Sequence, residues 1–157
     1  MAHTALGVGA EFDIVRMMVA RYGAAADGIG DDAAVLDLPA GQRLVVSTDV
    51  SVEGAHFRAD WLSPEEIGAR ATTAALSDLA AMAAWPIGIV VAFTLPEAWR
   101  ASAPALADGV ARAAVAAAVP IVGGDLSDGA TLSLAVTVLG AVGTPVTRAG
   151  ARAGDAV

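Results

Sequence analysis

The sequence predicts an α+β domain with a mixed sheet of four to five strands and helices on one face. Apolar residues follow helical spacing in some stretches and strict alternation in others. The elements are expected in the order helix, two strands, helix, strand, helix, two strands. At 157 residues, with no cysteine, the chain is long enough to bury a core without disulfides.

The first third of the chain contains one helix signal and two strand signals. We expect an amphipathic helix over residues 10–22, with Gly23 as its natural stop. Two short apolar runs follow, at 33–39 and 43–50, separated by three turn-forming residues. Their spacing predicts a hairpin.

The strongest local signal is a helix start at Ser63. Pro64 suits the first helical position, and Glu66 stands where its carboxylate can complete a capping box with the serine. The apolar pattern continues this helix to about Ala84.

The second half of the chain alternates between strands and one helix. A β-rich run over 87–95 predicts a strand, and an alanine-rich stretch over 97–118 predicts a helix. A short strand is expected at 120–122, followed by a turn at 123–129. Strict alternation over 131–142 predicts the longest strand.

Charge limits the possible partners. All nine basic residues are arginine, there are 17 acidic residues, and the net charge is −8. Such a chain is unsuited to nucleic acid or to an anionic membrane surface. A phosphate ligand would need metal ions as intermediaries.

No membrane-spanning segment is expected. The two longest uncharged runs are 79–96 and 130–147. The first is interrupted by a proline and a glycine, so neither half is long enough to span a membrane. The second alternates between apolar and polar residues with a period of two, as a half-buried strand does. The N-terminal stretch lacks a basic region followed by an apolar run, so we expect a cytoplasmic protein. Residues 1–142 are interpreted as one domain, and the Gly/Pro/Ala/Arg-rich residues 143–157 as the start of a linker to an absent domain.

Two stretches in the first third place acids beside turn or strand-end signals. Asp32 lies in the stretch 28–33, where two glycines precede two adjacent acids. This stretch is either a cation site or a solvated turn. Ser47, Thr48 and Asp49 end an apolar run, where they are either oxygen ligands or a strand cap.

Asp78 lies in a helix that is apolar nearly all the way round, so we expect its carboxylate to be buried. A buried carboxylate must bind a metal, serve another function, or pair with a distant arginine. Gly124 and Asp125 belong to a turn in which the backbone can approach a ligand, although a plain turn is the alternative.

The histidine, arginine and tryptophan residues also have structural as well as functional interpretations. His56 is either a functional residue or an ordinary surface histidine. Arg148 is either a phosphate ligand or a solvated linker residue. The three tryptophans are assigned to packing.

The acidic stretches together form a set of hard oxygen ligands, which is the preference of Mg²⁺. Several aspartates on Mg²⁺ usually indicate phosphate chemistry. Because the chain has no lysine, a P-loop and a protein-kinase lysine are both excluded.

Five collinear stretches resemble the ordered motifs of the thiamine-monophosphate kinase family, within the aminoimidazole ribonucleotide synthetase-like superfamily. The resemblance covers residues 11–157 and matches the family's N-terminal domain. Departures are Leu126 for threonine, Ala83-Ala84 for the commoner Gly-Ala, and Ser51 for leucine. The five stretches are GIGDDAAV (28–35), STDVSVEGAHF (47–57), LSDLAAMAAWP (76–86), GGDLSDG (123–129) and TRAGARAGD (147–155).

The resemblance implies ATP-dependent phosphorylation of thiamine monophosphate to thiamine diphosphate, with several Mg²⁺ ions and no catalytic base. It implies that His56 contacts thiamine monophosphate. It implies nucleotide contacts from Gly124, Asp125 and Arg148. The implied metal ligands are Asp32, Ser47, Thr48, Asp49, Asp78 and Asp125.

The resemblance also implies a homodimer in which two sheets join into a barrel. Without the family's C-terminal domain, this chain is expected to be inactive or nearly so. Two alternatives remain: another ATP-dependent enzyme of the superfamily, from hydrogenase maturation or purine synthesis, or a dimerisation domain without catalysis. A selenophosphate synthetase is disfavoured because its N-terminal cysteine and lysine are missing.

Overall fold

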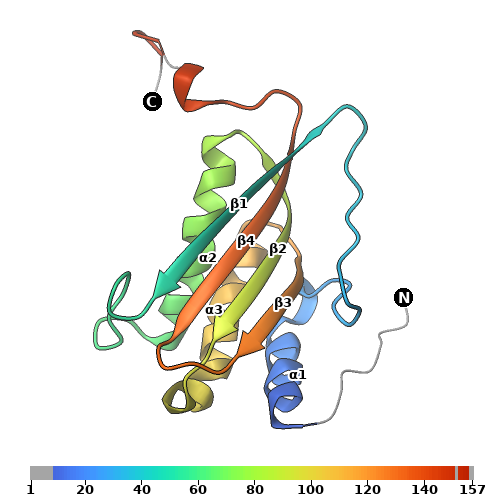
Figure 1. Cartoon of the computed structure of the whole chain (residues 1–157). Helices are drawn as coiled ribbons and strands as arrows, with labels where there is room; N and C mark the ends of the chain where they lie inside the picture. Colours follow the sequence, from blue (N-terminus) through green and yellow to red (C-terminus); the bar gives the residue numbers. More distant parts are fainter. Residues whose placement is uncertain (1–8, 151, 156–157) are drawn as a thin grey trace.

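The strands form one layer and the helices form another, as Figure 1 shows. This computed structural model describes residues 9–150 and 152–155. The strands are β1 (Arg43–Val52), β2 (Trp85–Thr94), β3 (Ile121–Ser127) and β4 (Ser133–Val142). The helices are α1 (Ala10–Tyr22), α2 (Pro64–Ala81) and α3 (Ala103–Ala116), with short 3-10 helices η1 (Gly23–Ala25), η2 (Glu97–Ser102) and η3 (Arg148–Gly150).

The sheet has four strands in the order β1-β4-β2-β3. β4 is antiparallel to both of its neighbours, whereas β2 and β3 are parallel. The expected mixed sheet is therefore confirmed with four strands. The alternation over 131–142 is confirmed too, because every second residue of β4 from Leu134 to Val138 is buried.

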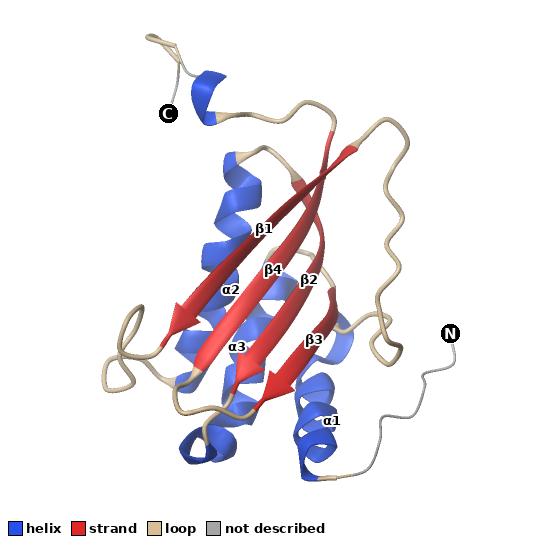
Figure 2. Cartoon of the chain, in the orientation of Figure 1, coloured by secondary structure: helices blue, strands red, loops and turns tan. Residues whose placement is uncertain are grey.

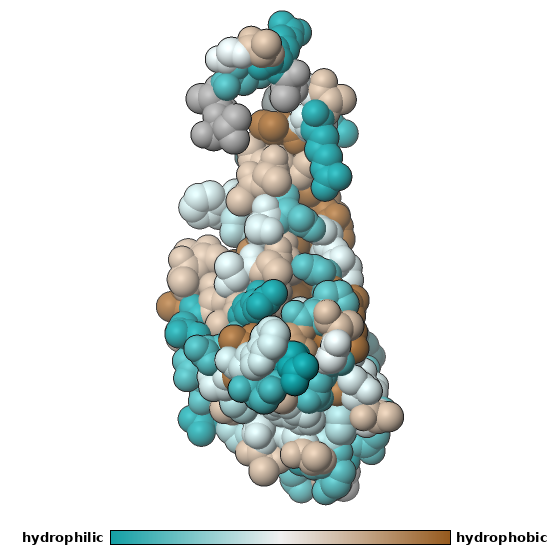
Figure 3. Space-filling model, turned by 90° about the vertical axis from the view of Figure 1, so that its left-hand side faces the viewer, coloured by the Kyte–Doolittle hydropathy of each residue, from teal (hydrophilic) through white to brown (hydrophobic). Residues whose placement is uncertain are grey.

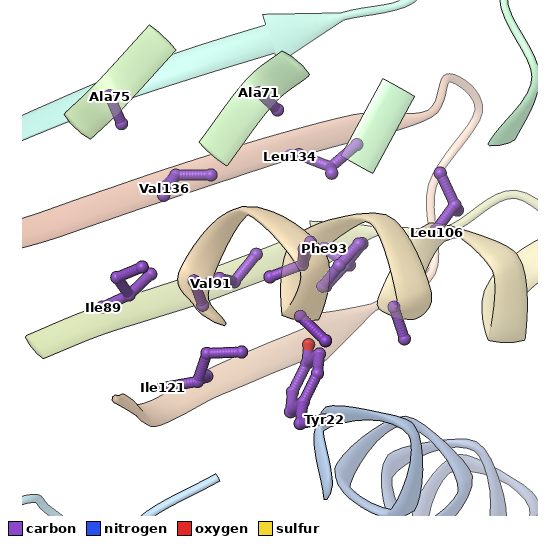
Figure 4. Close-up of a cluster of buried hydrophobic side chains, with 14 of the residues drawn as sticks. Tyr22, Ala71, Ala75, Ile89, Val91, Phe93, Leu106, Ile121, Leu134 and Val136 are labelled. Atoms are coloured by element: carbon purple, nitrogen blue, oxygen red, sulfur yellow. The ribbon is translucent and has the colours of Figure 1, made fainter. Parts of the chain in front are cut away.

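All three helices lie on one face of the sheet, behind it in Figure 1. The buried side chains gather between these two layers, and Figure 4 shows members from β2, β3, β4 and the helices pointing toward one another. Tyr22 is buried at the end of α1, and burial raises the pKa of its hydroxyl above the ordinary value. Within residues 9–150 and 152–155, no helix covers the opposite face of the sheet.

α2 begins as predicted. The Ser63 hydroxyl accepts a hydrogen bond from the Glu66 backbone N–H, and the Glu66 carboxylate accepts one from the Ser63 backbone N–H at 2.8 Å. The latter bond is the main reason why the pKa of Glu66 lies below its ordinary value. The helix ends at Ala81, three residues earlier than expected, because Ala83 adopts a left-handed conformation at φ 54°.

The hairpin predicted over 33–39 and 43–50 is wrong in its first strand. Residues 33–39 form no strand, and Val35 is 93% exposed. The turn itself exists, since Gln42 N–H donates to the Pro39 carbonyl and Gly41 takes a positive φ. β1 pairs with β4 on one side and leaves its other edge open. The run before the turn crosses the sheet instead of pairing with β1, because Leu36 lines the same cavity as Val90, Val122 and Leu139.

Two boundaries in the second half also differ. The helix expected over 97–118 begins as the 3-10 helix η2 and becomes α-helical only at Ala103. The turn expected at 123–129 is wrong, because β3 runs through both glycines to Ser127. A side chain at Gly124 would lie 2.3 Å from the Val91 carbonyl oxygen, so glycine permits a close approach of two strands here rather than a turn.

Parts of two predictions fall outside the described residues. The N-terminal stretch that predicted the absence of a leader includes residues 1–8, and the expected linker includes residues 151, 156 and 157.

Candidate functional site

The candidate site begins with the direction of three strands. β1 and β2 are each antiparallel to β4, and β3 is parallel to β2, so β1, β2 and β3 run in one direction. Their carboxyl ends therefore lie at the same end of the sheet, where Figure 2 shows the three arrowheads. The segments that follow the strands are 53–57, 97–102 and 128–129, and the first contains the predicted site residue His56. Loops at the carboxyl ends of strands are common positions for binding residues.

The turn after β1 holds His56 in one orientation. The Val52 backbone N–H donates to His56 Nδ1 at 3.2 Å, and the His56 backbone N–H donates to the Val52 carbonyl at 2.8 Å. The imidazole is exposed, whereas neighbouring Phe57 is buried. An accepting Nδ1 corresponds to the imidazole tautomer that carries its proton on Nε2.

The following residues form an exposed aromatic and charged group. Arg58 donates two hydrogen bonds to Asp60, both at 3.0 Å, and its guanidinium lies 5.1 Å from the ring centre of Trp61. The bond from Arg58 lowers the pKa of the Asp60 carboxyl below its ordinary value. Trp61 is 74% exposed, so the assignment of all three tryptophans to packing is wrong for this one and for the exposed Trp85.

Ser47 and Asp78 lie together at the β1 edge of the sheet. The Ser47 hydroxyl donates to Asp78 Oδ2 at 2.5 Å, which links β1 to α2. Asp49 is half-buried on the same face of β1 and accepts from the Val50 backbone N–H. Asp78 itself is exposed, so the expectation that it is buried is wrong. The helix is rich in alanine on every side, and only one of those sides packs.

Thr48 points to the other face of the sheet. Its hydroxyl lies 2.9 Å from that of Thr137 on β4, which is its partner in the strand register. The alternation of a strand therefore separates Thr48 from Ser47 and Asp49.

Asp125 lies on the face away from the helices. The register aligns it with Ala92, Ala135 and the exposed Val50 across the sheet. Its carboxylate accepts a hydrogen bond from the Ser127 hydroxyl at 3.1 Å. This aspartate is a strand residue rather than a turn residue.

Asp32 lines a cavity of about 650 Å³. The Asp32 backbone N–H donates to the Asp31 carboxylate, and Gly28 and Gly30 both take positive φ values that glycine permits. The cavity wall also includes Gly124. Two predicted site residues, Asp32 and Gly124, therefore share one cavity at the β3 edge.

Four of the predicted residues thus lie in two pairs. Ser47 and Asp78 are bonded on the helix face at the β1 edge, whereas Asp32 and Gly124 line a cavity that also reaches Val90 of β2 and Leu139 of β4. Among residues 9–150 and 152–155, no three His, Cys, Asp or Glu side chains are close enough to hold one metal ion.

Arg148 belongs to the short helix η3, which lies at the end of the molecule opposite the three carboxyl ends (Figure 1). The segment before it is attached by one hydrogen bond, from the Val146 backbone N–H to the Met82 carbonyl at 3.1 Å.

Comparison with known proteins identifies the family. The sequence model of the family described as "AIR synthase related protein, N-terminal domain" matches residues 30–142. The chain belongs to this AIR synthase-related family. The match includes every predicted site residue except Arg148.

Relatives within the AIR synthase-related family have more specific names. A thiamine-monophosphate kinase from Synechococcus elongatus is 49% identical over 129 residues, which are 80% of this chain and 39% of that protein. One from Mycobacterium tuberculosis is 41% identical over 131 residues, 82% of this chain and 39% of that protein. The resemblance to thiamine-monophosphate kinases is confirmed, and the chain spans about two fifths of the length of these curated relatives.

Solved structures of the AIR synthase-related fold agree. Thiamine-monophosphate kinase from Stenotrophomonas maltophilia has a TM-score of 0.70 at 39% identity, covering 85% of this chain and 43% of that one. The structure named AaThiL complexed with AMPPCP and TMP has a TM-score of 0.68 at 27% identity, covering 94% and 48%. The hydrogenase maturation protein HypE of Escherichia coli has a TM-score of 0.72 at 25% identity, covering 87% and 45%.

Sequence analysis missed two side-chain pairs in this AIR synthase-related domain. Trp99 Nε1 donates to Glu53 Oε2 at 3.0 Å, and Arg100 pairs with Asp128 at 2.5 Å. Both pairs join η2 to segments that follow other strands. The signal for the first pair was present in EGAHF, where Glu53 stands three residues before the singled-out histidine.

The surface of the AIR synthase-related domain offers no membrane segment. In the part of the chain that the structure describes, no helix is both long and apolar enough to cross a membrane. In Figure 3 hydrophilic and hydrophobic residues are interspersed over the side that faces the viewer.

Proposed function

We propose that this chain is the ATP- and Mg²⁺-binding part of a thiamine-phosphate kinase, which transfers the γ-phosphoryl group of ATP to thiamine monophosphate. The observation that carries the proposal is its 49% identity to a thiamine-monophosphate kinase over 80% of the chain. The AaThiL structure, which contains AMPPCP and TMP and covers 94% of the chain, is consistent with it. The proposal places the protein in the cytoplasm, where ATP is available.

The chemistry of the acceptor matches the residues present. A phosphate monoester is already ionised at neutral pH, so the transfer needs no catalytic base. It needs groups that neutralise two repelling anions and hold them in line. Aspartate and serine oxygens suit Mg²⁺, which would supply that neutralisation when bound.

The proposed ligands divide according to their position. Ser47, Asp49 and Asp78 would hold Mg²⁺ at the β1 edge, because their oxygens lie on or beside one face of β1. Asp32 and Gly124 would meet the nucleotide at the 650 Å³ cavity. The remaining proposed contacts are Thr48 and Asp125 to metal, Asp125 and Arg148 to ATP, and His56 to thiamine monophosphate.

A homodimer is part of the proposal. The sheet face without helices carries three exposed apolar side chains of β1, namely Leu44 at 53%, Val46 at 54% and Val50 at 40% exposure. β1 and β3 also leave edges without a strand partner. Joining two sheets into a barrel would cover both features, and it would bring Thr48 and Asp125 on that face toward the second copy.

Calorimetry tests the nucleotide half of the proposal. Titrating AMPPCP into the 157-residue chain should give binding that requires Mg²⁺. Asp78→Asn should weaken this binding at least tenfold, because it removes a charged oxygen ligand. Asp37→Asn is the matched control, since Asp37 is an exposed carboxylate outside the cavity lining and should leave the affinity unchanged.

Two outcomes contradict this proposal. Equal binding without Mg²⁺, or equal binding by Asp78→Asn, would exclude the metal site at the β1 edge. Absence of binding by the folded chain would favour a dimerisation domain without catalysis.

The choice of acceptor separates the remaining alternative. HypE has a similar fold at 25% identity, so a hydrogenase-maturation or purine-synthesis enzyme is the second candidate. Thiamine monophosphate should bind the chain more tightly than unphosphorylated thiamine. If the chain binds nucleotide but neither thiamine monophosphate nor thiamine, the second candidate is favoured.

A further inference from the structure

The half-buried bond between Trp99 and Glu53 joins two segments that lie 46 residues apart in sequence. The Trp99 indole N–H donates to the Glu53 carboxylate at 3.0 Å. Glu53 directly follows β1, and its backbone N–H donates to the Leu132 carbonyl at 3.0 Å, just before β4. A hydrogen bond to an ionised acceptor is among the stronger ones in proteins. The start of the turn is therefore fixed both to the sheet and to η2.

The same turn determines the state of His56. Gly54 N–H donates to the Phe57 carbonyl at 2.8 Å, and Gly54 takes a positive φ of 81°. Buried Phe57 anchors the far end of the turn in the core. With both ends held, the Val52 backbone N–H points at His56 Nδ1, and the exposed ring keeps its proton on Nε2.

η2 is itself fixed at its next residue. Arg100 pairs with Glu97 at 2.6 Å and with Asp128 at 2.5 Å. Asp128 directly follows β3, three residues after Asp125. Trp99 is therefore held by a short helix that is attached at both the β1 and the β3 carboxyl ends.

We propose that Glu53 and Trp99 are positioning residues, which hold the His56 ring as an Nε2–H donor toward the phosphate of the acceptor substrate. This inference rests on the proposed function for the identity of the substrate. The arrangement suits a phosphate, because a fixed neutral N–H donor can approach an oxygen anion without the cost of orienting a free ring. Phe57 and the backbone bonds close the turn, while the indole–carboxylate bond sets its direction relative to η2.

The first readout is the tautomer of His56, measured by ¹⁵N–¹H correlation of the imidazole ring in the 157-residue chain. His56 signals are assigned by their loss in His56→Gln. The unmodified chain should show an unprotonated Nδ1 and a protonated Nε2. Trp99→Phe keeps the aromatic packing but removes the donor, and it should move both nitrogens toward the averaged values of a freely exchanging ring.

Three controls separate positioning from general damage. Glu53→Gln keeps an acceptor oxygen and should preserve the tautomer, whereas Glu53→Leu should lose it. Trp85→Phe changes an exposed tryptophan in β2 and should have no effect on His56. Circular dichroism and the thermal midpoint of each variant verify that it is folded.

The second readout is binding of thiamine monophosphate, measured from amide shifts. Trp99→Phe and Glu53→Leu should weaken it about fivefold, the effect of one lost hydrogen bond, and Glu53→Gln should restore it. An unchanged His56 tautomer in folded Trp99→Phe would overturn the proposal. If the unmodified chain fails to bind thiamine monophosphate, the proposed substrate is wrong for this chain, and the tautomer measurement still decides whether Glu53 and Trp99 position His56.

Discussion

The close contact between α2 and α3 permits a specific stability prediction. Replacing a glycine there by alanine should stabilise the helix by propensity and destabilise the packing, so the two effects change the free energy of unfolding in opposite directions. A Cβ at Gly109 would lie 1.9 Å from the Glu65 carbonyl oxygen and 2.8 Å from the Ala69 nitrogen. A Cβ at Gly68 would lie 2.2 Å from the Leu106 carbonyl oxygen. All of these neighbours are backbone atoms of the facing helix, so they cannot rotate away. Helix propensity alone favours alanine over glycine by about 1 kcal/mol.

The packing cost exceeds that gain. Ordinary contact begins at 3.4 Å, so Gly109→Ala must separate the two backbones by about 1.5 Å, which is 3.4 minus 1.9. A gap of 0.5–1 Å already forfeits roughly a quarter to a half of each dispersion contact. Overpacking costs typically about 1–3 kcal/mol and occasionally more, and a contact of 1.9 Å with backbone atoms belongs at or above the upper end of that range. After the propensity gain of about 1 kcal/mol, we expect a net loss of about 2–3 kcal/mol.

Urea unfolding followed by circular dichroism measures this loss. Gly109→Ala and Gly68→Ala should both lower the free energy of unfolding, and the thermal midpoint should fall by roughly 4–12 °C for a chain of this size. Thr73→Ala, at an exposed position of α2, should change the free energy of unfolding by less than about 0.5 kcal/mol. A Gly109→Ala variant as stable as the unmodified chain would refute the backbone contact, because propensity would then decide alone.

Three further predictions concern single residues. Ala83→Gly should raise the free energy of unfolding by about 1 kcal/mol in urea melts, because φ 54° is costly for alanine and free for glycine; no gain would contradict that strain. Tyr22 is the single tyrosine, and burial raises the pKa of its hydroxyl. Ultraviolet titration should therefore show no phenolate above pH 10 for as long as the protein stays folded. The free energy of unfolding should fall as the pH rises beyond the ordinary tyrosine pKa, and this fall should be absent in Tyr22→Phe. The backbone N–H of Ser63 lowers the pKa of Glu66, so this contribution to stability is complete above about pH 4.3 and is lost as pH falls through the lowered pKa. Urea midpoints between pH 6 and pH 3 should therefore fall less steeply in Glu66→Gln, and identical slopes would contradict the capping bond.

Elements with a local cause were predictable from the sequence. The capping box at Ser63 and the helical spacing over 10–22 act within a few residues, and both helices begin where expected. The conformation of residues 33–39 was not predictable, because it depends on contacts with distant residues. This run is as apolar as a strand, but it leaves the open edge of β1 unpaired, and its Leu36 lies beside Val122 of β3 and Leu139 of β4.

The sequence did not predict how the candidate site residues are placed. Every proposed ligand was named from its residue type and motif, yet adjacent Ser47 and Thr48 face opposite sides of one strand. Asp78 was expected to be buried because alanine on all sides of a helix resembles a core pattern. Alanine is also an ordinary surface residue of helices, so the pattern did not specify which side packs.

The sheet divides the proposed ligands between its two faces. β1, β2 and β3 run in one direction, so their carboxyl ends lie at the same end of the sheet. The antiparallel β4 lies between β1 and β2, and its Leu139 lines the same cavity as Asp32. Leu139 is aligned with exposed Val46 of β1, on the face without helices, whereas the half-buried Ser47 bonds to Asp78 of α2 on the other face. The sheet itself therefore separates these two groups of proposed ligands, because neighbouring residues of a strand point to opposite faces.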